Sequence, residues 1–168
     1  MNLTPGVPYF YVVSALTPAG ETANSAEASA TPDNQLFGTA IGTAGSFGNV
    51  GATKELALDG SLENFFDGPD SVSWVGLDLG ASASAVISQV RYAPRKTFGG
   101  RMVGGKFQGS STADFSSGVT DLFTISAAPP DGVLTTRAIT NPTAFRYLRY
   151  LSPTGGFGNV AEVQFFGK

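Results

Sequence analysis

Cysteine and histidine are both absent from the 168 residues of this chain. Without cysteine, neither a disulfide framework nor a thiolate zinc site can form. Without histidine, the chain lacks the commonest general base, the Ser–His and Cys–His nucleophile pairs, and the ligand of most transition-metal sites. The metal chemistry that remains is that of oxygen ligands, which suit calcium or magnesium.

Charge and long apolar runs are also scarce. Charged residues make up 14% of the chain and the formal net charge is −3, with no cluster of Lys or Arg, which argues against nucleic acid and anionic membrane surfaces as partners. No stretch of about 18 apolar residues occurs that would span a membrane. Residues 1–5 have no basic-then-apolar signal pattern, so we interpret Met1 as a start codon placed on an excised fragment and expect targeting information upstream.

What the chain does contain is glycine and proline, 22 and 10 residues, scattered without a period. This distribution predicts many turns. From about Leu36 onward, the turns separate short apolar runs, which are residues 73–80, 85–92, 102–109, 122–125, 144–151 and 161–166. Because runs of about 5 to 8 residues between turn signals are typical of strands, we expect an all-β protein built as an antiparallel sandwich, without a long helix.

The first thirty residues have a different pattern. Residues 9–15 alternate as a buried strand does, residues 18–20 are a turn signal, and residues 21–30 form a second, more polar strand, which together predict a β-hairpin. The spacing resembles the last two strands of a fibronectin type III domain, in which Tyr9 would be the corner tyrosine. The resemblance implies that residues 1–30 are a truncated remnant of such a domain.

An isolated hairpin is marginally stable in water. We therefore expect Tyr9, Tyr11 and Val13 to pack on the main domain or on a second copy of the chain, or to be poorly ordered. Residues 31–35 are predicted to be a linker, and the main domain is predicted to cover residues 36–168.

Six segments of the main domain, taken in their order along the chain, resemble a second known family. They are 57–60 with Phe66, then 74–80, 87–95, 101–110, 145–150 and 161–167. In this order they resemble the discoidin-like, or coagulation factor five/eight type C, family, which includes many bacterial carbohydrate-binding modules with the galactose-binding-domain jelly roll. The resemblance covers nearly all of residues 36–168 and implies a jelly-roll β-sandwich. It also implies that Trp74, the one tryptophan, is buried.

The resemblance further implies one structural calcium ion, because family members commonly hold it in the loop after the first strand. Its ligands here would be the carboxylates of Asp59 and Glu162, an oxygen of Asn64 and the backbone carbonyls of Leu56, Ser61 and Ala161. Calcium takes about 6–8 oxygen ligands, which this set supplies. Ser61 and Asn64 stand where many relatives have Asp and Thr, so the site has fewer formal charges. The alternative is that Asp59 belongs to a simple turn and Glu162 to a surface strand.

The tetrapeptide Phe-Gly-Asn-Val occurs twice, at residues 47–50 and 157–160. If a metal joins the segments that follow the two copies, Phe47, Asn49, Phe157 and Asn159 lie on neighbouring loops. A sugar ring lays its C–H face on an aromatic side chain and its hydroxyls on amide or guanidinium groups, which makes these four residues candidate ligand contacts. The alternative is that both phenylalanines are core residues that close their loops.

A second candidate loop covers residues 94–101. Arg95 and Arg101 are fork-shaped donors suited to paired hydroxyls, and Phe98 stands between glycines and charges. The alternative for Arg101 is an ion pair with a carboxylate such as Asp67 or Asp78. For Asp67 itself, the sequence favours a turn over a contact with sugar hydroxyls.

The function that these features favour is a non-catalytic carbohydrate-binding module. It would target an appended catalytic domain of a secreted glycoside-active enzyme to a polysaccharide, with plant-wall or β-glucan polymers as the first ligand class and galactosides as the second. Many related sugar sites use a histidine, which this chain lacks. The alternative is an adhesion or assembly module that binds a protein or a cell surface. An enzyme is not expected, although a carboxylate pair such as Asp67 with Asp70 is the type that glycoside hydrolysis needs.

Overall fold

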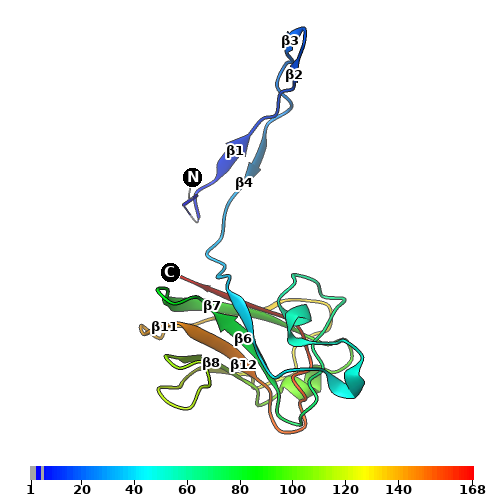
Figure 1. Ribbon diagram of the computed structural model, residues 1–168, viewed down its shortest axis with the longest axis vertical. Coiled ribbons are helices and arrows are strands. Elements are labelled where there is room, and N and C mark those ends of the chain that lie inside the picture. The colour runs from blue at the N-terminus through cyan, green and yellow to red at the C-terminus, as the bar shows by residue number, and fades with distance from the viewer. Residues whose placement is uncertain (1–2, 5) are drawn as a thin grey trace. The chain divides into compact units, whose positions relative to one another are not determined.

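The computed structural model describes residues 3–4 and 6–168. The chain forms two compact units, Met1–Asn34 and Gln35–Lys168 (Figure 1). Every strand pair in the described residues is antiparallel, and the helical pieces there are short 3₁₀ turns. None of the helices in that part of the chain has the length and apolar character that a membrane crossing requires.

The first unit is the hairpin expected from the sequence. Strand β1 (Tyr9–Tyr11) pairs with β4 (Ala28–Ala30), and β2 (Leu16–Thr17) pairs with β3 (Gly20–Glu21) at the turn. Between these pairs, hydroxyl side chains extend the ladder: the backbone N–H of Val13 donates to Ser25 Oγ, and that of Ala15 donates to Thr22 Oγ1.

Large apolar side chains of this unit are exposed to solvent. Val13 is 72% exposed and Leu16 is 88% exposed. The hydroxyl of Tyr9 accepts a hydrogen bond from the backbone N–H of Thr4 at 2.7 Å, which is the kind of backbone contact that a corner tyrosine makes. The likeness to a fibronectin type III domain and the packing partner of this hairpin stay predictions.

The second unit is a sandwich of two sheets. One sheet has the strand order β5 (Thr39–Gly42), β6 (Trp74–Asp78), β12 (Tyr147–Leu151), β8 (Lys106–Ser110) and β9 (Thr120–Thr124). The other is organised around the long strand β7 (Ala85–Pro94), which pairs along one edge with β13 (Val160–Gly167) and along the other with β10 (Thr135–Ala138) and β11 (Ala144–Phe145). The expected all-β antiparallel sandwich is confirmed.

The core lies between the two sheets, and aromatic rings fill its centre. Alternate residues of the strands point inward, as the two-residue period of a strand requires. Phe107 of β8 is fully buried, and its ring centroid lies 5.2 Å from that of Tyr92, 5.5 Å from that of Tyr150 and 5.9 Å from that of Phe165. Because these rings come from both sheets, one contiguous cluster joins the sheets.

Two local expectations differ from the structure. Gln35, expected in the linker, pairs with Phe166 at the end of β13, so the sandwich begins one residue earlier than predicted. Trp74, expected in the core, is only half-buried, because it lies on the face of β6 opposite the core residue Val75. Its ring packs there against Phe115, with centroids 5.4 Å apart.

Candidate functional site

The register of β7 and β13 brings four loops together at one end of the sandwich. Pro94, the last residue of β7, pairs with Val160, the first residue of β13, so the loop after β7 and the loop before β13 leave the sheet side by side. Phe66 also pairs with Val160 and adds the segment 66–68 to this end. The backbone N–H of Phe47 donates to Asp67 O at 2.7 Å, which attaches the 3₁₀ turn η1 (Phe47–Asn49).

The segment 66–68 lies between the two Phe-Gly-Asn-Val loops. Its Asp67 carbonyl binds the first loop, and the N–H of Gly68 donates to Phe157 O in the second loop at 2.6 Å. The close packing needs glycine in the second loop: a Cβ at Gly158, where φ is +67°, would lie 2.6 Å from the ring of Phe66. The repeated motif is therefore brought together in space.

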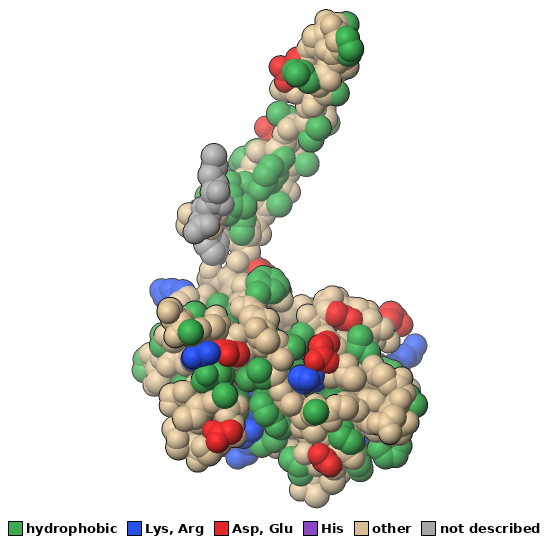
Figure 2. Space-filling model, in the orientation of Figure 1, with side chains coloured by type: hydrophobic (Ala, Val, Ile, Leu, Met, Phe, Trp, Pro, Cys, Tyr) green, Lys and Arg blue, Asp and Glu red, His purple; other side chains and the backbone are tan. Residues whose placement is uncertain are grey.

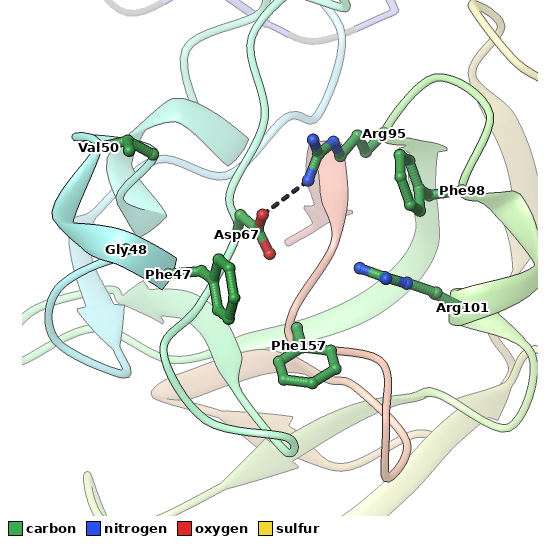
Figure 3. A pocket seen from close by; sticks show the side chains of 8 residues that line it. All are labelled: Phe47, Gly48, Val50, Asp67, Arg95, Phe98, Arg101 and Phe157. Atoms are coloured by element: carbon green, nitrogen blue, oxygen red, sulfur yellow. Dashed lines mark hydrogen bonds and ion pairs between the residues drawn. The ribbon is translucent and has the colours of Figure 1, made fainter.

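These loops enclose a cavity of about 470 Å³ (Figure 3). It is lined by Phe47, Gly48, Val50, Asp67, Arg95, Phe98, Arg101 and Phe157. This volume falls within the range of about 300–1,000 Å³ that small-molecule sites usually have. Five of the seven ligand contacts predicted from the sequence are among these eight residues.

Two phenylalanines form one side of the cavity. The rings of Phe47 and Phe157 meet edge to face, with centroids 6.1 Å apart. Phe47 is 56% exposed and Phe157 is half-buried, so neither is a core residue that closes its loop. Phe157 has φ of +53°, a left-handed conformation that is costly for a residue with a bulky side chain and is concentrated at functional sites.

Two arginines face these rings from the other side and are held by a short polar network (Figure 3). Arg95 NH1 donates to Asp67 Oδ2 at 2.6 Å, and Arg101 NH1 donates to Asn159 Oδ1 at 2.8 Å. The amide of Asn159 closes the network by donating to Asp67 Oδ1. Both guanidinium groups are thereby fixed before a ligand arrives, and each keeps N–H donors beyond these bonds, since arginine has five.

Phe98 lies between the two arginines. The guanidinium carbon of Arg95 is 4.4 Å from the ring centroid of Phe98, and that of Arg101 is 4.5 Å from it. These are cation–π distances, which limit the rotamers of both arginines further. The cavity thus combines apolar ring surface with a few fixed hydrogen-bond donors, the usual composition of a site for a small polar ligand.

Two of the predicted contacts, Asn49 and Asn159, do not line the cavity. Asn159 is 0% exposed and its amide is bonded to Asp67 and Arg101, so it positions the arginine and is not accessible to a ligand. Asn49 is exposed but is not among the residues that line the cavity. Arg101 pairs with this amide and not with either suggested carboxylate, because Asp67 pairs with Arg95 and Asp78 pairs with Arg146.

Asp67 is the site residue that sequence reasoning missed, since a turn role was favoured. Asp67 is 9% exposed, and its two carboxylate oxygens accept from two different side chains of the network. The only signal in the sequence was an acid directly after the aromatic pair Phe65–Phe66, because the proximity of Asp67 to Arg95 arises only in the folded chain. Val50 and Gly48 also line the cavity, and nothing in their residue types points to that position.

The predicted calcium loop lies beside this site, after the 3₁₀ turn η2 (Lys54–Ala57), which packs against β13. Glu162 Oε2 accepts from the backbone N–H of Gly60 at 3.1 Å, so the carboxylates of Asp59 and Glu162 come from the two chain segments that were expected to meet. Among the described residues, no group of three or more His, Cys, Asp and Glu side chains is placed to hold a metal ion. Any calcium here would depend on two carboxylates and on carbonyl oxygens.

Burial of Glu162 is the observation that bears most directly on a cation at this position. The side chain is 1% exposed, and burial, with a smaller contribution from the charge of Asp59, raises its pKa from 4.5 to about 7 in spite of hydrogen bonds from Gln164 and Gly60. A buried carboxylate without a cationic partner is costly. A divalent cation would supply the missing charge, so the donor set fits calcium in this respect.

Asn64 fits less directly. Its Nδ2 donates to Asp59 Oδ2 at 2.8 Å, and the backbone N–H of Ser61 donates to Asp59 Oδ1 at 2.8 Å. The nitrogen of the Asn64 amide therefore faces the carboxylate, and the amide would have to turn over to offer its oxygen to a metal ion. Leu56, Ser61 and Ala161 contribute backbone carbonyls, which need no such change.

Comparison with known proteins finds similar chains among solved structures. No protein-family model matches the chain, and no curated protein matches it. Among solved structures, the CBM62 of Xyl5A from Clostridium thermocellum is 50% identical, with a TM-score of 0.78, and the match covers 80% of this chain and 96% of that one.

Two further structures share the fold at lower identity. Chitosan-binding module 1 of a chitosanase/glucanase from Paenibacillus sp. IK-5 is 18% identical with a TM-score of 0.58, and the match covers 80% of this chain and 98% of that one. A CBM32 module from Clostridium perfringens, solved in complex with GalNAc-β-1,3-galactose, is 21% identical with a TM-score of 0.56 and coverages of 77% and 94%. These comparisons confirm the galactose-binding-domain-like, or discoidin-like, architecture, and the identity to the first structure shows that the chain belongs to the CBM62 family of carbohydrate-binding modules.

Proposed function

We propose that this chain holds a secreted glycoside-active enzyme on its polysaccharide substrate, with the cavity between Phe47 and Arg101 as the sugar site. The observation that carries the proposal is the pairing of exposed aromatic rings with fixed guanidinium groups in one cavity. A sugar ring would lay its C–H face on Phe47 or Phe157, and its hydroxyls would accept from the donors of Arg95 and Arg101.

The module would act by holding an appended catalytic domain close to the polymer, and would not itself catalyse a reaction. The Asp67 carboxylate already accepts from two side chains, and the chain has no histidine to act as a base, so the cavity offers no acid–base pair for hydrolysis. Binding raises the effective concentration of an appended catalytic domain at the polymer. Affinities in the micromolar to millimolar range, about 4–8 kcal/mol, suffice for this purpose when several modules act together.

The ligand class that we propose first is a plant-wall or β-glucan polymer, and galactosides are second. In both, the ligand is a neutral sugar with several hydroxyls, which suits the hydrogen-bond donors of Arg95, whose charge Asp67 balances. On the face of the molecule in Figure 2, Lys and Arg side chains lie apart from one another.

Calcium belongs to the same proposal. Asp59 and Glu162, with carbonyls of Leu56, Ser61 and Ala161 and the amide oxygen of Asn64, would hold the ion. It would neutralise the buried Glu162 and tie the loop to β13, and its role would be structural.

Gel electrophoresis through soluble polysaccharide tests the proposal. We expect hydroxyethylcellulose or pectic galactan to retard the protein, and we expect Phe157→Ala to abolish the retardation. Phe37→Ala is the matched control, because Phe37 is 77% exposed and lies outside the cavity. Unchanged migration of the wild-type protein in both polymers would overturn the proposed function.

A further inference from the structure

A second cavity lies directly beside the first. Its volume is about 300 Å³, and it is lined by Leu62, Glu63, Asn64, Phe65, Arg95, Lys96, Asp131 and Gly132. Arg95 is the one residue that lines both cavities, so its side chain is their common wall. The other seven residues lie outside the first cavity, and one of them, Asn64, is also a proposed calcium ligand.

Two aromatic rings flank this common wall. The guanidinium carbon of Arg95 lies 4.1 Å from the ring centroid of Phe65 and 4.4 Å from that of Phe98. Phe65 lines only the second cavity and Phe98 only the first. Each cavity therefore has its own ring surface beside one shared set of guanidinium donors.

The wall between the cavities is rigid. Arg95 is held by its ion pair with Asp67 at 2.6 Å. The next turn of its loop is tied to the far side of the second cavity, because the backbone N–H of Thr97 donates to Asp131 Oδ2 at 2.8 Å. Thr97 has φ of +69°, which is unusual for a β-branched residue and indicates that the surrounding contacts determine the loop conformation.

The charges of the second cavity cancel. Its lining contains two acids, Glu63 and Asp131, and two bases, Arg95 and Lys96. Such a lining offers both donors and acceptors to hydroxyl groups and has no excess charge to attract an anionic or cationic ligand. Glu63 and Lys96 are both exposed, so both side chains can turn toward a ligand.

We infer that the second cavity is a subsite for the neighbouring sugar unit, so that the module recognises at least two consecutive residues of a neutral glycan, with Arg95 donating to both. This inference rests on the proposed function of the first cavity. The first sugar lies among Phe47, Phe98 and Phe157, and the second lies against Phe65 and the side chain of Lys96.

Isothermal titration calorimetry with short sugars tests the subsite, and the polymer that retards the protein decides which sugars are used. The probes are cellobiose and glucose if hydroxyethylcellulose retards the protein, or β-1,4-galactobiose and galactose if pectic galactan does. We expect the disaccharide to bind at least tenfold more tightly than its monosaccharide. Phe65→Ala should make the affinities for disaccharide and monosaccharide equal, and Lys96→Ala should lower their ratio at least threefold. Both variants should keep the monosaccharide affinity within twofold of wild type.

Phe37→Ala is again the matched control, and melting curves show whether each variant is folded. If Phe65→Ala does not fold, the exposed Lys96 carries the test alone. Equal binding of disaccharide and monosaccharide by the wild-type protein would overturn the subsite and leave the proposed function standing. An unchanged ratio of disaccharide to monosaccharide affinity in the folded variants would also overturn the subsite and leave the proposed function standing. Failure of every polymer to retard the protein would instead remove the proposed function, and the subsite with it.

Discussion

In the metal-free form, the stability of this module should depend on pH between about 4.5 and 7, and Glu162 is the reason. Below pH 4.5 its carboxyl is protonated in both the folded and the unfolded chain and adds no pH dependence. Above that pH the unfolded carboxyl ionises, while burial keeps the folded one protonated up to about pH 7. The free energy of unfolding therefore falls as the pH rises through this window, and above the window it stays at the lower value.

The magnitude follows from the two pKa values. The interval from 4.5 to about 7 corresponds to a loss of about 3 kcal/mol in the free energy of unfolding. For a unit of this size, that is a fall in melting temperature of roughly 10 °C. The window is free of histidine titration, and the lowered pKa values of Glu55, Asp78, Asp114 and Asp121 place their effects at more acidic pH.

The assay is differential scanning calorimetry of chelator-treated protein from pH 4.5 to 8, with and without added calcium. Calcium should remove the fall, because the cation stabilises the ionised carboxylate. Glu162→Gln should be insensitive to calcium and, without metal, more stable than wild type at pH 8. Glu63→Gln, a change in an exposed acid of the same loop, is the matched control and should behave as wild type. A flat profile for the metal-free wild type, or a calcium shift that survives in Glu162→Gln, would refute the reasoning.

Four further predictions concern other parts of the chain. Phe157→Ala should weaken binding of the retarding polymer about tenfold in calorimetry, since it removes an aromatic surface, while the melting temperature changes little; an equal loss in Phe37→Ala would contradict this. Asp67→Asn should lower the free energy of unfolding by about 1–3 kcal/mol in urea titration, and should also weaken sugar binding, because one acceptor holds two side chains. Tyr150→Phe should be neutral or stabilising by up to about 1 kcal/mol, because the Tyr150 hydroxyl is buried without a hydrogen-bond partner in the described part of the chain; clear destabilisation would instead reveal a bound water. Deletion of residues 1–34 should leave the melting temperature of the sandwich and its sugar affinity unchanged, and light scattering before and after deletion tests self-association through the hairpin.

The strands were predictable because their local patterns are strong. The apolar runs at 85–92 and 161–166 became β7 and β13 with one or two residues added at the ends. These runs are long and bounded by turn residues, so local sequence and tertiary packing favour the same structure. Trp74 was misplaced because the face that a strand residue occupies depends on register, and the loop that carries Phe115 covers the outer face of its sheet.

The site was predictable in part for the same reason. The repeated tetrapeptide correctly indicated two loops that meet, but it could not distinguish its two asparagines, which have identical neighbours in sequence. Asn159 is buried because Asp67 and Arg101, both distant along the chain, surround its amide, whereas the corresponding Asn49 is exposed. Partners of this kind are tertiary information, and a single sequence does not contain their distances.

The pairing of Gln35 with Phe166 has a consequence for how the module can be used. The chain enters and leaves the sandwich at the same pole, next to the last residues of β13, while the cavities open beside the first residues of that strand. The length of eight extended residues, about 25 Å, separates the two poles. A domain joined before Gln35 or after Lys168 is thus attached at the pole remote from the proposed sugar site, and fusion at either terminus should leave the approach to that site unobstructed.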